Sequence, residues 1–516
     1  MTFDYDLVII GSSPAAIYAA KTAARWQARV ALVQPESSQM NWLMPSSLYG
    51  RAAINLLDSR LGDTNWGEAD WGVDWGDSKD NLRWSESANK TQHPDSSVDS
   101  SLDSSFHALS ILERLNSIAT GVERIREENS TAVLASAGID VIASNGQFIP
   151  KPSLAFEVNN RLLRSRAYLL ATGSHPAIPS NIPELTEPNS LLRTEIENFI
   201  TRPLSSIPKS LIVIGADPRG IEFAQTFARQ GSKVTLIVPT ATLLPAEDPE
   251  AAQLILAQLE VEGIDIILDT TVTQIKSIDK KKWVQAGDRA IEADEILLAA
   301  GYQANIESLN LERVGVEYAE LSEVRAIGHH LQVNRKMQTT NPRIYACGEV
   351  AGGYPFPHLA ECEARIALKN ALFLPIFKVD YSTIPWALFS KPQLARVGLT
   401  EPQARRRYGD IVVLRKYFKS VAAAAWRGET TGFCKIIARS NGKMVGVHIV
   451  GPEATELIHS FALSIENGIK VGAIASVPHI WATLSEINRQ TAELWQREKL
   501  RPWQNFLEAF FNWRRG

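Results

Sequence analysis

The sequence predicts an α/β fold with two Rossmann-like domains, followed by a C-terminal α+β domain. The segment YDLVIIGSSPAAIYAA (5–20) has the pattern of a strand, a tight turn and a helix, and SLIVIGADPRGIEFA (210–224) repeats that order. After residue 381 the pattern changes, because several strands precede the helices. Each repeat is typical of a dinucleotide-binding βαβ unit, whose turn aims backbone N–H groups at a pyrophosphate. The chain therefore has two candidate dinucleotide sites.

The turn of the first unit is built from small residues. They form a candidate cofactor-binding set: Gly11, Ser12, Ser13, Ala15 and Ala16. The usual spacing is G-x-G-x-x-G/A, and a serine stands here at the middle position. The next expected strand leads to Gln34, where an acid would bind the ribose hydroxyls. Glutamine can also bind a ribose, but more weakly than a carboxylate.

The second unit carries Gly215, Asp217 and Gly220 at the three positions, so an acid replaces the middle glycine. A carboxylate about 4 Å from a phosphate costs up to about 4 kcal/mol at an effective dielectric constant of about 20. That cost weakens binding about a thousandfold, and Arg219 would offset part of it. Two interpretations stay open: a domain that has kept its fold and lost its ligand, or a nucleotide site that still works.

Other expected elements follow from the periodicity of apolar residues. We expect helices over 15–24, 109–126, 219–230, 250–262, 454–467 and 471–475, one from near residue 45 and one after residue 487. We expect strands over 7–10, 29–33, 131–135, 138–143, 154–158, 166–171, 386–389, 411–417, 433–439 and 445–450. The stretch 343–371 reads as a strand, a glycine-rich turn and a helix. The segment 58–105 is an acidic insertion with regularly placed tryptophans, either a solvated loop or a docking element.

The composition is that of an ordinary soluble protein, with 45% hydrophobic and 21% charged residues among 516. The net charge of −4 gives no reason to expect a nucleic-acid partner. The three cysteines lie far apart without CxxC or C-x4-C spacing, so neither a metal site nor a local redox disulfide is expected. The sequence has no signal-peptide pattern and no apolar run that could span a bilayer, and a cytoplasmic location is expected.

Five phrases occur in one order along the chain: 11–16, 171–173, 215–224, 347–360 and 483–486. In this order they resemble the flavin-dependent pyridine nucleotide–disulfide oxidoreductases, the family of dihydrolipoamide dehydrogenase, glutathione reductase and mercuric reductase. The resemblance implies an FAD-binding domain from 1–189 and 325–379, an NAD(P)-binding-like domain over 190–324 and a dimerisation domain over 380–490. It implies a homodimer, and leaves an amphipathic aromatic tail over 491–516.

The resemblance also implies FAD-binding residues outside the first turn. Glu349 after Gly348 matches the acid that holds the ribityl chain, although its side chain is one methylene longer. A helix that starts near Phe356 would aim its N-terminus at the flavin N1/O2 edge and stabilise negative charge there. The other residues that match family phrases at this site are Ala171, Thr172, Gly173, His358 and Ala360.

The redox residues of the family are missing from the matched phrases. The cysteine pair falls near Ser38 and on Leu43, and the lysine near flavin N5 is replaced by Ser47. Trp481 stands in place of the acid–base histidine, and indole cannot transfer protons at neutral pH. His479, two residues earlier, is either a structural histidine or a replacement base. The catalytic residues are therefore unassigned, and the candidates near the flavin are Glu222 and Glu486.

These losses lead to a main hypothesis and alternatives. The main hypothesis is an FAD-dependent oxidoreductase that reacts directly at the flavin with an unidentified donor and acceptor, for example a quinone. Bulky apolar residues at 40, 42–44 and 481 would either fill the space of the disulfide or line a site for such an acceptor. The alternatives are a non-catalytic or sensory flavoprotein, an NAD(P)H-dependent enzyme whose second site works, and a module that has lost the flavin.

The tail PWQNFLEAFFNWRR (502–515) has the period of an amphipathic helix. At 100° per residue its aromatic residues and Leu507 share one face: Trp503, Phe506, Phe510, Phe511 and Trp513. This face suits a membrane surface, a protein partner or the protein's own dimer. The first of these would make the protein a peripheral membrane protein.

Overall fold

A computed structural model of the chain describes residues 3–35, 124, 127–178, 182–186, 194–195, 208–279, 281–320, 329–353 and 355–516. The insertion at 58–105, the helix near residue 45 and nearly all of the expected helix 109–126 lie outside these ranges. So do residues 38, 40, 42–44 and 47, which bear on the missing cysteine pair and lysine. The expectations for these segments stay predictions.

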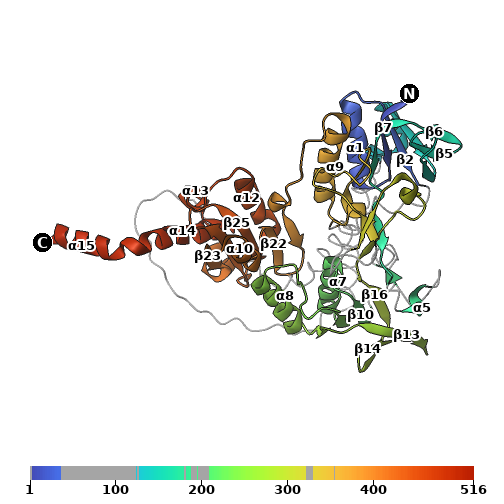
Figure 1. Ribbon diagram of the computed structural model, residues 1–516. Coiled ribbons are helices and arrows are strands. Elements are labelled where there is room, and N and C mark those ends of the chain that lie inside the picture. The colour runs from blue at the N-terminus through green and yellow to red at the C-terminus, as the bar shows by residue number, and fades with distance from the viewer. Residues whose placement is uncertain are drawn as a thin grey trace, which may run out of the picture.

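The first Rossmann-like domain is built on a parallel sheet in the order β20-β7-β1-β2-β3 (Figure 1). The strands are β1 (Tyr5–Ile10), β2 (Val30–Gln34), β3 (Ile139–Ala143), β7 (Ser165–Leu170) and β20 (Ile344–Ala346). Helices α1 (Pro14–Arg25) and α9 (Pro357–Leu372) pack on one face. Antiparallel β4 (Gly146–Ile149), β5 (Ala155–Val158) and β6 (Arg161–Leu163) cover the other face. Both faces of β1 are buried, which explains its continuous apolar run.

The second Rossmann-like domain repeats this plan in the order β12-β11-β10-β16-β9. Its parallel strands are β9 (Thr194–Glu195), β10 (Ser210–Ile214), β11 (Lys233–Ile237), β12 (Asp265–Ile267) and β16 (Glu295–Leu298). Helices α7 (Pro218–Arg229) and α8 (Pro249–Val261) pack on one face. On the other face lie β13 (Val272–Ile278), β14 (Lys281–Ala286) and β15 (Arg289–Ala293), which form an antiparallel meander. The two strand–turn–helix units of the sequence are confirmed.

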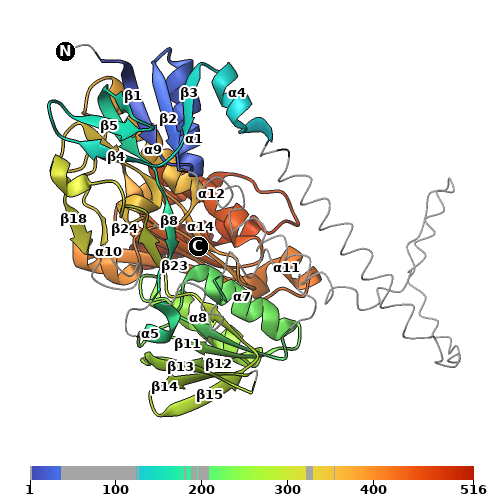
Figure 2. The same ribbon diagram turned by 90° about the vertical axis from the view of Figure 1, so that its right-hand side faces the viewer.

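Short elements join the two domains. Strand β8 (Ser174–Pro176) follows β7 and pairs antiparallel with β17 (Tyr302–Ala304), which follows β16. The carboxyl ends of the two parallel sheets are therefore tied together, and Figure 2 shows β8 running between the domains. Other short elements are α5 (Pro183–Thr186), β18 (Tyr318–Glu320) and β19 (His329–Leu331).

The C-terminal domain is α+β, as predicted. Its antiparallel sheet has the order β21-β22-β25-β24-β23, formed by β21 (Trp386–Leu388), β22 (Gln393–Gly398), β23 (Ile411–Tyr417), β24 (Phe433–Arg439) and β25 (Met444–Gly451). The helices are α10 (Glu401–Tyr408), α11 (Ala422–Trp426), α12 (Ala454–Glu466), α13 (Val471–Ser476) and α14 (Glu486–Leu500). The tail forms α15 (Gln504–Arg515), as its periodicity predicted.

One expected strand is wrong. Residues 131–135 form most of a short helix, α4 (Thr131–Ser136), instead of a strand. The side chain of Ser130 caps it by accepting the backbone N–H of Val133 at 3.4 Å. Leu134 is its buried residue, so the segment lacks the alternating burial of a strand. A local cap and one apolar anchor outweigh the β propensity of Thr131 and Val133.

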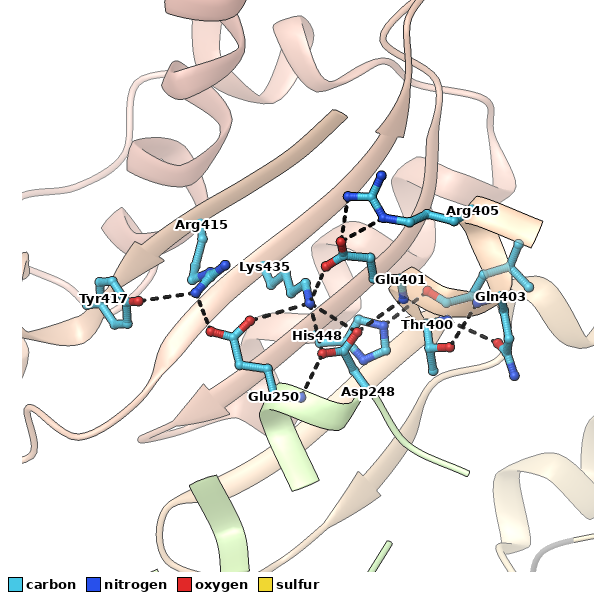
Figure 3. Close-up of polar contacts among 11 residues, drawn as sticks. Asp248, Glu250, Thr400, Glu401, Gln403, Arg405, Arg415, Tyr417, Lys435 and His448 are labelled. Atoms are coloured by element: carbon cyan, nitrogen blue, oxygen red, sulfur yellow. Dashed lines mark hydrogen bonds and ion pairs between the residues drawn. The ribbon is translucent and has the colours of Figure 1, made fainter. Parts of the chain in front are cut away.

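A buried ion cluster joins the second Rossmann-like domain to the C-terminal sheet. Lys435 on β24 is 3% exposed, and its Nζ lies 2.9 Å from Asp248 Oδ1 and 2.7 Å from Glu401 Oε2 (Figure 3). Asp248 is fully buried at the start of α8 and also accepts the backbone N–H of Glu401 at 3.1 Å. The apolar cores meet here as well, because Phe433 belongs to the same cluster as Ile255 of α8. The two domains therefore pack as one unit.

His448 lies beside this ion cluster on β25. Its Nε2 lies 3.0 Å from the carbonyl oxygen of Leu399 and donates to it. Burial lowers the pKa of His448 to about 4, so the ring is neutral at pH 7. A neutral ring adds no second cation beside Lys435, whose Nζ also lies 3.4 Å from Glu250 Oε2 as the third carboxylate of the cluster.

We expect Lys435→Met to lower the free energy of unfolding by about 3–5 kcal/mol, because the buried carboxylate of Asp248 loses its counter-ion. Arg405→Ala is the control, since it breaks an exposed ion pair with Glu401 and should cost at most about 1 kcal/mol. Urea unfolding of both variants measures the difference. Equal losses in the two variants would contradict a structural role for the buried pair.

Candidate functional site

The first turn brings two backbone segments into direct contact at the carboxyl end of the first sheet. Gly11 has a φ of 132°, and a Cβ on it would lie 2.1 Å from the carbonyl oxygen of Ala171. Only glycine can occupy this position. Gly11 N–H donates to Val33 at 2.9 Å, and Ala171 N–H donates to Ile10 at 2.8 Å. The turn is therefore held between β2 and β7, and it directs the N-terminus of α1 to this edge.

Ser13 stands at the middle position of the turn and caps α1. Its Oγ accepts the backbone N–H of Ala16 at 3.3 Å and donates to the carbonyl oxygen of Ala171 at 2.7 Å. Ser12, Ala15 and Ala16 are buried. The turn is thus small and carries no charge. It leaves the positive end of the helix dipole available to an anion.

Two further predicted residues lie at the same edge. Gln34 is the last residue of β2, the strand next to β1, and is 5% exposed. Thr172 follows Ala171, and its Oγ1 is buried without a hydrogen-bond partner among the described residues. A buried hydroxyl left without a partner indicates a polar ligand at this place.

Glu349 approaches this edge from the turn after β20. A Cβ on Gly173 would lie 3.9 Å from both Ser13 Cβ and Glu349 Oε2, so these residues converge. Ser174 Oγ donates to Glu349 Oε2. Burial raises the pKa of Glu349, while the hydrogen bond from Ser174 and the charge of Arg219 lower it, and Asp217 raises it further. The charges of Arg219 and Asp217 in the second unit therefore affect the pKa of Glu349 in the first site.

Glu363 on α9 supports the turn that carries Glu349. Its side chain accepts the backbone N–H of Gly348 at 2.7 Å and the hydroxyl of Tyr381 at 2.9 Å. Burial raises its pKa to about 7, and these two hydrogen bonds oppose the rise. The carboxylate faces a cavity of about 270 Å³ together with Gly353 and Trp386. Glu363 thus fixes the backbone immediately before Glu349.

The start of α9 lies where the first domain meets the C-terminal domain. Phe356 is its N-cap residue and stacks on His358 with 5.4 Å between ring centroids. His358 donates from Nε2 to the carbonyl oxygen of Pro385 at 2.9 Å. Ala360 lies one turn into the helix, and a Cβ added to Gly348 would lie 3.3 Å from the Cβ of Ala360. Phe356 and His358 also line a mostly apolar cavity of about 640 Å³ between α9, α12 and β21.

The second unit has the same backbone but a different turn. A Cβ on Gly215 would lie 2.2 Å from the carbonyl oxygen of Ala299, and one on Gly220 would lie 2.3 Å from Ala299 Cβ. Asp217 caps α7 by accepting the backbone N–H of Arg219 at 3.0 Å. The guanidinium of Arg219 lies 3.4 Å from the same carboxylate and 4.2 Å from the centroid of the Tyr302 ring. A negative side chain thus occupies the helix N-terminus.

The candidates for catalysis are dispersed. Glu222 on α7 is buried and accepts the backbone N–H of Phe389 at 2.8 Å, in the C-terminal domain. Glu486 begins α14 and lies 3.7 Å from Arg489. Trp481 is 71% exposed and makes an edge-to-face contact with Trp426. His479 contacts the carbonyl oxygen of Val477 through Nδ1 at 2.9 Å.

The described residues of the first unit fit an FAD molecule. They supply a glycine turn without room for a Cβ, an uncharged helix N-terminus, an orphaned Thr172 hydroxyl and a carboxylate at Glu349. The second unit fits a pyrophosphate poorly, because the Asp217 carboxylate that caps α7 places a negative charge at the helix N-terminus.

Sequence reasoning missed Glu363 and Tyr381. A signal for Glu363 exists, because Leu359 and Ala367 bracket it at intervals of four on the buried face of α9. A glutamate on such a face needs partners, and the sequence does not identify them. Tyr381 lies 18 residues away and meets Glu363 only through the fold.

Comparisons with known proteins agree with this architecture. A model of the pyridine nucleotide-disulphide oxidoreductase family matches residues 5–365, and a model of the dimerisation domain of that family matches residues 384–492. Mercuric reductase from Staphylococcus aureus is 29% identical over 488 residues, which cover 94% of this chain and 81% of that protein. A dihydrolipoyl dehydrogenase from Bacillus subtilis (strain 168) is 30% identical over 359 residues, 69% of this chain and 73% of that protein.

Solved structures share the fold. The HOCl-induced flavoprotein disulfide reductase RclA from Escherichia coli has a TM-score of 0.74 and 23% identity, covering 95% of this chain and 100% of that chain. LpdA from Mycobacterium tuberculosis has a TM-score of 0.74 and 22% identity, covering 94% of this chain and 98% of that chain. At these identities the likeness bears on the fold alone.

We expect Gly11→Ala to abolish FAD binding, because the new methyl group collides with the carbonyl oxygen of Ala171. Gly138→Ala is the matched control: Gly138 also has a positive φ, 83°, but no atom lies within 4 Å of the added Cβ. It should cost about 1 kcal/mol of stability and leave FAD bound. Visible absorbance of the purified variants reports bound flavin. Equal flavin content in both would contradict the proposed site.

A second prediction concerns Glu363. The pKa of Glu363 in the folded protein, about 7, lies above its ordinary value of 4.5. Its contribution to stability is therefore complete below about pH 4.5 and is lost as the pH rises through 7. Glu363→Gln should therefore gain stability relative to the wild type by up to about 3 kcal/mol between pH 5 and pH 8. Urea unfolding at both pH values measures this change, with Glu361→Gln on the same helix as the control. A difference between wild type and Glu363→Gln that does not vary with pH would refute the assignment.

Proposed function

Because the chain belongs to the pyridine nucleotide–disulphide oxidoreductase family, we propose that it is an FAD-dependent oxidoreductase that exchanges electrons directly at the flavin, without a cysteine relay. FAD, the cofactor of the family, supplies a carrier of two electrons when bound. The observation that carries the proposal is the distribution of cysteines. By the resemblance, the redox pair would fall near Ser38 and on Leu43, neither of which is a cysteine, and the three cysteines of the chain lie elsewhere.

The three cysteines are unsuited to replace the missing pair. They lie on separate elements: Cys347 after β20, Cys362 on α9 and Cys434 on β24. Burial raises the pKa of Cys347 well above its usual value and that of Cys434 to about 12. The pKa of Cys362 is raised as well, by partial burial. Thiols in such surroundings stay protonated at neutral pH and do not form the thiolate that disulfide exchange requires.

We propose that NAD(P)H is not the electron donor. The support is the turn of the second unit, where Asp217 caps α7 and Arg219 is held between that carboxylate and the ring of Tyr302. A pyrophosphate would have to displace this arrangement and face the carboxylate. The alternative, an NAD(P)H-dependent enzyme, requires Arg219 to turn toward the phosphates and outweigh Asp217.

The acceptor that we propose is a flat hydrophobic molecule of the quinone class. The support is the cavity of about 640 Å³ beside the start of α9, which Phe356, Ile384, Trp386 and Leu463 line. Its size and apolar lining suit a ring system, and His358 and His459 offer polar groups at its wall.

The molecule acts as a homodimer, in keeping with its dimerisation domain. That domain exposes large apolar side chains in the single chain, among them Trp426, Leu463, Ile480 and Trp481. Large apolar side chains this exposed are consistent with a surface that a second copy covers. We propose that Trp481 and Glu486 reach the flavin site of the partner in this dimer, as the family pattern implies.

A second candidate function is a non-catalytic or sensory flavoprotein that acts through a partner or a membrane. The exposed aromatic helix α15 favours it, since a soluble enzyme has no need of that surface. The two candidates differ in one measurable property, which is turnover at the flavin.

The test uses the purified flavoprotein under anaerobic conditions. Its flavin is reduced by light and then mixed with a soluble benzoquinone or naphthoquinone. We expect reoxidation of the flavin within seconds at micromolar quinone, together with a yellow oxidised protein at the start. A yellow protein whose reduced flavin ignores quinones would favour the sensory alternative, and a colourless protein would refute FAD binding.

Disulfide substrates provide a separate prediction. We expect no turnover above the buffer rate with lipoamide, glutathione disulfide or a chromogenic disulfide, because no thiolate pair is present to pass the electrons on. Steady-state assays with either nicotinamide cofactor or with photoreduced protein measure this. Robust activity on any of them would overturn the proposal of a direct route.

A further inference from the structure

The C-terminal helix α15 (Gln504–Arg515) extends away from the rest of the molecule. It continues α14 through a 3-10 turn (Arg501–Trp503) and points outward from the C-terminal domain (Figure 1). None of its described side chains is buried. The match to the dimerisation domain ends at residue 492, before α15 begins. The helix therefore lies outside the part of the chain that matches the dimerisation domain of the family.

One face of α15 is aromatic. Trp503 and the four aromatic residues of the helix are between 38% and 77% exposed, and their rings contact one another. With Leu507 they occupy one side when the helix is drawn at 100° per residue. Such a face cannot remain in water without cost, and a flat aromatic strip suits the boundary between lipid headgroups and acyl chains.

The basic side chains around this face favour binding to an anionic surface. Residues 497–516 carry five basic and two acidic side chains in a chain whose net charge is −4. Arg514 falls within the aromatic face by the same helical wheel, whereas Arg515 turns back to Asn512 at 2.7 Å. A dry protein groove would need a carboxylate opposite Arg514. At a lipid surface, the guanidinium reaches the phosphates while the rings stay below it.

We propose that α15 docks flat on an anionic lipid bilayer, with its aromatic face toward the acyl chains and its arginines at the headgroup phosphates. Docking at the surface needs no spanning segment, and among the helices that the structure describes none could cross a bilayer. The proposal stands apart from the route of electrons through the flavin. It also places the protein next to the phase in which hydrophobic quinones dissolve, which agrees with the proposed acceptor.

The test measures co-sedimentation of the full-length flavoprotein with sucrose-loaded vesicles of phosphatidylcholine, alone or mixed equally with phosphatidylglycerol. We expect binding to the anionic vesicles that weakens as salt is added. Removing residues 502–516, or introducing Phe510→Ser with Trp513→Ser, should lower the partition coefficient at least about tenfold. Gln504→Ser with Asn505→Ser, on the polar face, is the control and should bind like the wild type. Because α15 buries no side chain, these changes leave the core intact.

Three outcomes would overturn the proposal. One is vesicle binding that survives the truncation, and another is equal binding to neutral vesicles. The third is a truncated protein that binds both kinds of vesicle as the wild type does but is monomeric in sedimentation equilibrium. That result would assign α15 to the dimer. Flavin content and reoxidation by a soluble quinone should be unchanged in all variants. A variant that loses flavin content or quinone reoxidation but still binds anionic vesicles would contradict the proposed function and leave the proposed lipid contact intact.

Discussion

The architecture depends on one close backbone approach that occurs twice. In each Rossmann-like domain the glycine after the central strand touches the backbone at the end of the neighbouring strand, Gly11 at Ala171 and Gly215 at Ala299. This contact leaves no room for a Cβ and turns the chain sharply into a helix whose positive end faces the sheet edge. Strands β8 and β17 then tie the two edges together, so the two helix N-termini face one region. That is why charges in the second unit shift the pKa of Glu349 in the first.

Within this shared frame, one side chain distinguishes the two units. Ser13 caps its helix with a neutral hydroxyl and leaves the site to an anionic ligand, whereas Asp217 caps its helix with a carboxylate that repels one. The second unit nevertheless remains well anchored. Lys435 with its three carboxylates and Glu222 with Phe389 bind α7 and α8 to the C-terminal domain. This anchoring holds the second unit in place by contacts that do not involve a nucleotide.

Much of the fold could be predicted from the sequence, because it follows from local patterns. Continuous apolar runs, the glycine turns and the prolines at the first helical positions identify both units and α9. The segment 131–135 forms a helix instead of the expected strand, because the side chain of Ser130 caps it. The Glu363–Tyr381 pair and the cluster around Lys435 could not be predicted, since they join residues that meet only after folding. The predictions for residues 36–123, including the replaced cysteine pair, stay predictions.

The central claim is that the first unit binds a dinucleotide and that the second unit does not, because the Asp217 carboxylate lies at its helix N-terminus. The most direct measurement mixes the oxidised flavoprotein with NADH or NADPH in an anaerobic stopped-flow instrument and follows flavin absorbance. We predict an unchanged spectrum for the wild type. Asp217→Gly, which removes the carboxylate at a cost of a few tenths of a kcal/mol in helix capping, should gain nucleotide binding and flavin reduction. Stoichiometric bleaching of the wild-type flavin within seconds by either nucleotide would contradict the account.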